Sequence, residues 1–107
     1  MESRTWTGHL EPMLLAILET GPSHGYAIID ELRRRSGGEF DLPEGSVYPA
    51  LHRLERRRLI ESSRVAVNGR ERRIYQLTSV GKRSLADGRA EWARFALAVR
   101  SVMGTAT

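Results

Sequence analysis

The chain has 107 residues, of which 40% are hydrophobic and 28% charged, with no cysteine and a net charge of +4. This length holds one domain with a modest core, and the balance of residues excludes a disordered tail. The missing cysteines exclude disulfides and thiolate metal sites, no apolar run approaches the roughly 20 residues of a membrane-spanning helix, and residues 1–12 lack the apolar stretch of a signal peptide. We therefore expect a cytoplasmic protein that contacts no membrane.

Two amphipathic helices are predicted in the first third of the chain. Apolar residues with helical spacing predict a helix over residues 11–19, and its inward face comprises Leu10, Met13, Leu14, Ile17 and Leu18. A second helix is predicted over residues 24–35 with Ser23 as its N-cap, and its inward face comprises Ile28, Ile29 and Leu32. Phe40 and Leu42, in the connector that follows, are expected to fill the core.

A third helix is predicted to begin between Pro43 and Ser46 and to end near Arg58. Its inward stripe comprises Val47, Leu51 and Leu54. If Ser46 is the N-cap, Pro49 lies harmlessly in the first turn; if the helix begins at Pro43, Pro49 must distort it. The sequence leaves both starts open.

A β-hairpin is predicted next, from two extended segments, 60–67 and 70–77, joined by an Asn-Gly pair at 68–69. Asn-Gly favours a type I′ turn because both residues tolerate positive φ. A two-residue loop pairs Val67 with Arg70, Ser62 with Tyr75 and Ile60 with Leu77. The same register sets Arg64 opposite Arg73, an unfavourable pair of like charges unless a phosphate lies between them. A slip of one residue would undo this pairing.

The last predicted helix spans residues 79–103 and carries a short apolar seam. Leu85, Trp92 and Val99 recur every seven residues, and Phe95 and Val102 lie beside them. So small a body cannot bury this whole stripe, so we expect a homodimer through Leu85, Trp92, Phe95, Val99 and Val102. Trp92 is expected to be a packed interface residue; lining a pocket for a planar ligand is the alternative.

Positive charge is concentrated in one part of the chain, residues 52–73, which we call the basic segment. It contains eight arginines and three glutamates and carries +5, whereas the rest of the chain carries −1. A local basic field beside a nearly neutral remainder indicates a polyanionic partner. A helix that leads into a basic hairpin is also how a winged helix-turn-helix meets double-stranded DNA.

The candidate DNA contacts lie on the third helix and the hairpin. Off the inward stripe of the helix lie Ser46, Tyr48, His52, Arg53 and Arg56. Arg53 can reach a guanine edge with two hydrogen bonds, although a solvated helix face is the alternative. The hairpin contributes Arg64, Arg70, Arg72 and Arg73. These arginines can hold phosphates or enter the minor groove, and four exceed what protection of a strand edge needs. The arginine run at 33–35 complements the helix dipole at the C-terminus of the second helix, which is a sufficient structural explanation for it.

Residues that would indicate catalysis or metal binding are missing from the pattern. His9, His24 and His52 do not have metal-ligand spacing. No paired carboxylates, phosphate-binding glycine loop or serine–histidine arrangement stands out. We therefore expect no metal, no cofactor and no enzymatic activity.

Three segments resemble the PadR family of bacterial transcriptional regulators. They are HGYAIIDEL at 24–32, GSVYPALHRLERRRLIE at 45–61 and RERRIYQLTSVGKRSL at 70–85, and they occur in the family's order. The resemblance covers roughly residues 10–85. The single helix after the wing is similar to the smaller subgroup of the family.

The resemblance implies a homodimeric repressor that binds an inverted-repeat operator near a promoter. Many members are released from DNA by a small aromatic or drug-like effector, which some bind between the terminal helices. In this chain the family's recognition helix would include Tyr48, His52 and Arg53. Its wing would include Arg70, Arg72 and Arg73. Trp92 would lie in the dimerisation helix, where some relatives stack a ligand on a tryptophan.

The expected fold is mainly α with a β-hairpin wing. Residues 1–78 would form a winged helix-turn-helix domain, with 1–9 as an N-terminal extension, and residues 79–107 a C-terminal dimerisation helix. The expected protein is a sequence-specific regulator in the bacterial cytoplasm, associated with the nucleoid when it binds DNA. The alternative is a winged helix that binds another protein, and the salt dependence of binding would separate the two.

Overall fold

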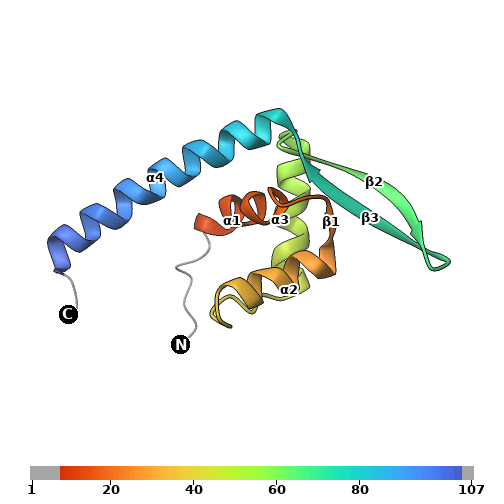
Figure 1. Cartoon of the computed structure of the whole chain (residues 1–107), viewed down its shortest axis with the longest axis horizontal. Coiled ribbons are helices and arrows are strands. Elements are labelled where there is room, and N and C mark those ends of the chain that lie inside the picture. Colours follow the sequence, from red (N-terminus) through yellow and green to blue (C-terminus); the bar gives the residue numbers. More distant parts are fainter. Residues whose placement is uncertain (1–7, 105–107) are drawn as a thin grey trace.

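The computed structural model describes residues 8–104, so residues 1–7 of the expected extension and residues 105–107 lie outside the described part. Its elements in chain order are α1 (Leu10–Leu18), β1 (Ser23–His24), α2 (Gly25–Arg35), α3 (Glu44–Arg56), β2 (Ile60–Val67), β3 (Arg70–Leu77) and α4 (Ser79–Met103). The first three helices gather beside the base of the β2–β3 hairpin, and α4 runs along one side of them (Figure 1). The mainly α fold with a β-hairpin wing is confirmed.

One hydrophobic core joins the three N-terminal helices to the base of the hairpin. Its most deeply buried large side chains are Leu14, Ile28, Val47, Leu51, Leu54 and Ile60. The predicted stripe of α3 is therefore confirmed, and Leu42 is buried with Phe40 packed against the same core. In α1 the prediction missed Leu15, which is buried, whereas Met13 is only partly covered. The reason is that α4 packs against α1, a contact that the periodicity of α1 alone does not indicate.

The start of α2 differs from the prediction. Ser23 is not the N-cap, because it pairs with Tyr75 in the short strand β1, which the sequence reading missed. The N-cap is His24, whose Nδ1 accepts a hydrogen bond from the backbone N–H of Ala27 at 3.3 Å. The His24 side chain therefore has a structural role at the start of this helix.

Of the two predicted starts of α3, the structure has the one near Pro43 and not the one at Ser46. The helix begins at Glu44 with Pro43 as its N-cap, so Pro49 lies inside it. Because proline has no N–H, the carbonyl of Gly45 lacks its usual helical donor. The helix ends at Arg56, before the expected Arg58, which adopts a positive φ of 63°. There the N–H groups of Arg58 and Leu59 donate back to the carbonyls of Glu55 and Leu54, which closes the helix in a Schellman motif.

The hairpin has the predicted register. Val67 pairs with Arg70, Ser62 with Tyr75 and Ile60 with Leu77. Asn68 and Gly69 both have positive φ, 53° and 75°, as a two-residue primed turn requires. β3 is the central strand, since β1 pairs with its other edge.

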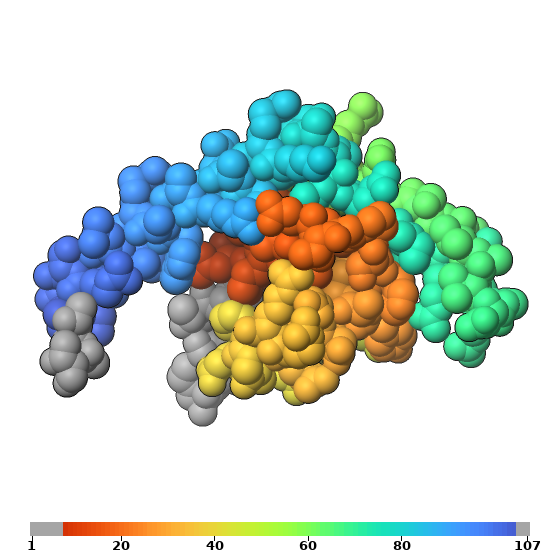
Figure 2. Space-filling view, viewed as in Figure 1, coloured from red at the N-terminus to blue at the C-terminus, as the bar shows by residue number. Residues whose placement is uncertain are grey.

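The terminal helix α4 has the predicted bounds, Ser79–Met103. Thr78 caps it, because its hydroxyl oxygen accepts a hydrogen bond from the N–H of Gly81 at 3.0 Å. The second half of α4 projects beyond the body at one end, as the hairpin does at the other, and the described chain extends 53 Å along its longest axis (Figure 2). No helix among the described residues is long and apolar enough to cross a membrane.

Candidate nucleic-acid interface

The outward face of α3 is a stripe opposite its buried residues. Helical residues advance by about 100° each, so a second stripe lies on the side opposite Val47, Leu51 and Leu54. This outward stripe comprises four exposed residues, Gly45, Pro49, His52 and Arg56. Of the predicted contacts, His52 and Arg56 lie on this stripe, whereas Ser46, Tyr48 and Arg53 flank it.

Tyr48 lies on the flank of α3 that faces α2. Its side chain is half-buried, because its ring packs on Gly25, where a β-carbon would overlap it. Burial raises the pKa of the Tyr48 hydroxyl above its ordinary value. Beside it, Tyr26 donates its hydroxyl hydrogen to Oε2 of Glu44 at 2.8 Å. The start of α3 is thereby fixed against the start of α2.

Arg53 lies on the other flank and is held by α1. Its Nε donates to Oε2 of Glu11 at 3.0 Å, and Nη1 of Arg57 donates to Oε1 of the same carboxylate at 2.7 Å. Glu11 is 42 residues away from Arg53 in the sequence. The sequence reading missed this contact, because no local pattern links a carboxylate in the first turn of one helix to an arginine in another.

The hairpin arginines lie on two different faces. Arg64 and Arg73 pair on the face of Tyr75, which packs toward the helices. Arg73 donates from Nη1 to Oγ of Ser62 at 2.9 Å, and Ser62 donates in turn to Oε2 of Glu55 at 2.6 Å. Arg64 is 3.6 Å from Oε1 of Glu71. Each of the two guanidinium groups therefore has a partner within the hairpin: Arg73 the neutral hydroxyl of Ser62, and Arg64 the carboxylate of Glu71.

Arg70 and Arg72 lie on the opposite, outer face of the hairpin. They pair there with Val67 and Val65, which are exposed. Arg70 is exposed as well, whereas Arg72 is half-buried. The guanidinium groups of four of the eight arginines of the basic segment have no acidic or hydrogen-bonding partner within residues 8–104: Arg56, Arg58, Arg70 and Arg72. The unpaired positive charge therefore lies on the outward stripe of α3, at the end of that helix and on the outer face of the wing.

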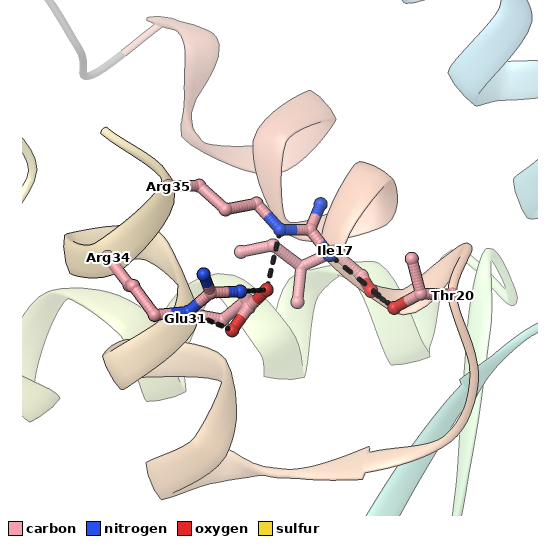
Figure 3. A network of polar contacts seen from close by, with 5 residues as sticks. All are labelled: Ile17, Thr20, Glu31, Arg34 and Arg35. Carbon is pink, nitrogen blue, oxygen red and sulfur yellow. Dashed lines mark hydrogen bonds and ion pairs between the residues drawn. The ribbon is translucent and has the colours of Figure 1, made fainter. Parts of the chain in front are cut away.

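The arginine run of α2 is bound within the protein (Figure 3). The Glu31 carboxylate accepts hydrogen bonds from Arg34 and Arg35. Arg35 also donates to Oγ1 of Thr20 at 3.5 Å, and Thr20 donates to the carbonyl of Ile17 at 2.9 Å. Arg33 pairs with Asp30. These contacts support the structural role predicted for residues 33–35.

The predicted dimer seam of α4 divides into two parts. Leu85 is only 3% exposed and belongs to the protomer's own core, because the first half of α4 packs against the body. Trp92, Phe95 and Val102 are 52%, 54% and 87% exposed, and Val99 is partly covered. The ring centroids of Trp92 and Phe95 lie 5.7 Å apart, and the ring centroid of His9 lies 5.0 Å from that of Trp92. The sequence reading gave no role to His9, whose nearness to α4 no local signal indicates.

No group of three His, Cys, Asp or Glu side chains suited to a metal ion occurs in the part of the chain that the structure describes.

Comparisons with known proteins agree with this geometry. A model of the transcriptional regulator PadR-like family matches residues 14–87. A Lysinibacillus sphaericus protein named uncharacterized protein X is 33% identical over 87 residues, 80% of this chain and 80% of that protein. A PadR-like transcriptional regulator from Bacillus cereus has a TM-score of 0.83 at 27% identity, over 97% of this chain and 100% of that chain. Bacillus subtilis PadR in complex with operator DNA has a TM-score of 0.66 at 26% identity, over 73% of this chain and 45% of that chain.

Proposed function

The chain belongs to the PadR-like family of transcriptional regulators, and we propose that it is a homodimeric repressor that binds an inverted-repeat operator. Membership makes it a DNA-binding transcriptional regulator. The proposal concerns how it binds, which residues contact the DNA and what controls release. It places the protein in the bacterial cytoplasm, on the nucleoid when it is bound to DNA.

The observation that carries the proposal is the position of the unpaired arginines. Arg56 on the outward stripe of α3, Arg58 at the helix end, and Arg70 and Arg72 on the outer wing face lack protein partners within residues 8–104. A helix in the major groove with a wing on the neighbouring backbone would direct such groups at phosphates and base edges. Exposed guanidinium groups that neutralise phosphates supply most of the affinity of such a complex.

The assignment of individual contacts follows from the two faces of α3. His52 and Arg56 lie on the outward stripe and are proposed to meet base edges or nearby phosphates. Ser46 and Tyr48 flank the stripe and are proposed to contact the backbone. Arg53 is proposed to reach a guanine with the guanidinium edge that Glu11 does not occupy.

The dimer is proposed to form through the second half of α4. Trp92, Phe95 and Val102 remain largely exposed in the single chain, and burial against a partner's copy would remove this apolar area from water. Two recognition helices would then enter successive major grooves about 34 Å apart, which requires a roughly palindromic operator. Leu85 is left out of this interface because the protomer buries it.

Release by a small aromatic or drug-like effector is proposed at the same place. The half-exposed ring of Trp92 offers a flat apolar surface of the kind that binds planar ligands, and the Phe95 ring lies beside it, tilted by 38°. A ligand between the two copies of α4 would change the spacing of the recognition helices, and hence the affinity for the operator.

Selection of bound duplexes from a random DNA pool at physiological salt tests the proposal. Enrichment of one inverted repeat would support a sequence-specific dimeric regulator, whereas retention of DNA without enrichment would indicate binding to the backbone alone. If no DNA is retained, the result favours a winged helix that binds another protein, or a dimer held in its released state. A steep loss of affinity between 50 and 200 mM salt is expected for phosphate contacts and not for an apolar protein contact.

A further inference from the structure

We propose that Glu11, in the first turn of α1, is a positioning residue for DNA recognition. It holds Arg53 of α3 by one edge of the guanidinium group, so that the other edge is presented to a base. This inference rests on the proposed DNA binding and adds to it a residue outside the recognition helix and the wing.

The geometry of the contact leaves the end of Arg53 available. Glu11 engages Nε, at 3.0 Å, and neither terminal nitrogen of Arg53 has a partner within residues 8–104. A guanidinium group reads guanine with two parallel N–H donors, directed at O6 and N7. The two terminal nitrogens can supply this pair while the Nε contact persists. The Arg53 side chain is 49% exposed, so a base can reach it.

Glu11 itself is held on both sides. Its second oxygen accepts a hydrogen bond from Arg57 at 2.7 Å, so both carboxylate oxygens are used. Its neighbour Pro12 packs beside Gly88 of α4, and the ring of His9 lies 5.0 Å from that of Trp92. The Glu11 carboxylate is thus held between α4 and α3, and it orients the long and otherwise flexible side chain of Arg53.

Orienting Arg53 before DNA binds reduces the entropy that this side chain loses on binding. An arginine loses side-chain entropy when it is immobilised at an interface, and a contact that already restrains it reduces this loss. The restraint acts only through a base that Arg53 contacts, so it favours the correct sequence and not DNA in general. A carboxylate that merely competed with phosphates for Arg53 and Arg57 would do the opposite, and weaken binding to every sequence.

The test compares Glu11→Gln with the wild-type protein on three duplexes: the selected operator, operators with single base changes, and an unrelated sequence. We expect the variant to bind the operator about fivefold to tenfold more weakly, the order of one weakened bidentate base contact. Affinity for the unrelated duplex should be unchanged. The loss should disappear on the operator whose guanine opposite Arg53 has been replaced.

Three further variants separate positioning from folding. Glu19→Gln removes the ion pair that Glu19, the C-cap residue of α1, makes with Arg89 of α4, but no contact with α3, so it should keep the full preference for the operator. Arg53→Ala should cancel the effect of Glu11→Gln in the double variant, because a residue that acts through Arg53 has no effect without it. If Glu11→Gln fails to fold, Glu11→Asp keeps the charge but shortens its reach, and should give a smaller loss of the same kind.

Four results would overturn the inference. An equal loss on all duplexes would make Glu11 a structural residue, and a gain on all of them would make it a competitor of phosphate. A loss that persists with Arg53→Ala would place its action elsewhere, and unchanged binding by Glu11→Gln would leave it without a role. The last result ends this inference alone, since the wild-type protein still binds; a wild-type protein that retains no DNA ends the proposed function as well.

Discussion

The ring of Tyr48 packs on the α-carbon of Gly25, so closely that a β-carbon at position 25 would overlap the tyrosine hydroxyl and ring. This contact joins α3 to the first residue of α2. Tyr26, the next residue, donates to Glu44 in the first turn of α3. The two tyrosines therefore fix the position of α3 relative to α2. Glycine is required at position 25 because any side chain there would overlap Tyr48.

Gly25→Ala should destabilise the protein, because either the Tyr48 ring or the start of α2 must move. Overpacking of this kind costs about 1–3 kcal/mol in the free energy of unfolding, which denaturant titration would measure. Gly45→Ala is the matched control, since nothing lies within 4 Å of a β-carbon there. Alanine at this helical position should instead stabilise the protein by about 0.5–1 kcal/mol. Equal effects of the two changes would contradict the packing argument.

Two glycines of α4, Gly81 and Gly88, distinguish the effect of a steric contact from the effect of helix propensity. A β-carbon on Gly81 would overlap the backbone carbonyl of Leu59, which cannot rotate away as a side chain can. Gly88 would meet Pro12 at 3.5 Å, an ordinary contact. Gly81→Ala should therefore lower the thermal midpoint, whereas Gly88→Ala should leave it unchanged or raise it, as alanine is favoured in a helix by about 0.5–1 kcal/mol. A raised midpoint for Gly81→Ala would show that α4 can shift away from Leu59.

These contacts show what the sequence could and could not predict. Periodicity gave the helices, and the Asn-Gly turn gave the register of the hairpin, because both signals are local. The glycines of the family segments could be recognised, but not explained, since the groups that meet Gly25 and Gly81 lie far along the chain. For the same reason, the link between Glu11 and Arg53, and the burial of Leu85 in the protomer, appear only in the folded chain.

The two hairpin faces lead to different predictions for neighbouring arginines. Arg72 has no acidic partner within residues 8–104, whereas Arg73 is hydrogen-bonded to Ser62. Arg72→Ala should weaken binding to all sequences and reduce the slope of log affinity against log salt by about one unit, the expected loss of one phosphate contact. Arg73→Ala, its matched control, should change the slope less and instead disturb the Ser62–Glu55 contact. An unchanged slope for Arg72→Ala would remove this residue from the interface.

The ion pair between α1 and α4 predicts a dependence on pH. Two hydrogen bonds from Arg89, at 2.8 and 3.0 Å, lower the pKa of Glu19 below its ordinary value of 4.5. Because the folded pKa is lower than the unfolded one, the pair stabilises the fold fully at neutral pH. Its contribution is lost as the pH falls below 4.5 and through the lowered pKa.

Thermal midpoints of the wild-type protein and Glu19→Gln, measured from neutral to acidic pH, would check this. The wild-type advantage should be present at neutral pH and shrink toward zero in acid, because a protonated Glu19 resembles glutamine. Glu31, whose pKa Arg34 and Arg35 also lower, is present in both proteins and cancels from the difference. A difference that stays constant over the range would exclude the Glu19 carboxylate as its source.

The two parts of the α4 seam should respond differently to truncation. Trp92 is 52% exposed and Leu85 3% exposed, so the first is available to a partner and the second belongs to the core of one chain. Trp92→Ala should raise the dissociation constant of the dimer, seen by sedimentation at several concentrations, with little effect on the folding of each protomer. Leu85→Ala should lower the free energy of unfolding by about 2–5 kcal/mol, the usual cost of a cavity at a buried leucine. If Trp92→Ala dissociates no more readily than the wild-type protein, the dimer forms through another surface, and an effector site between the two copies of α4 loses its support.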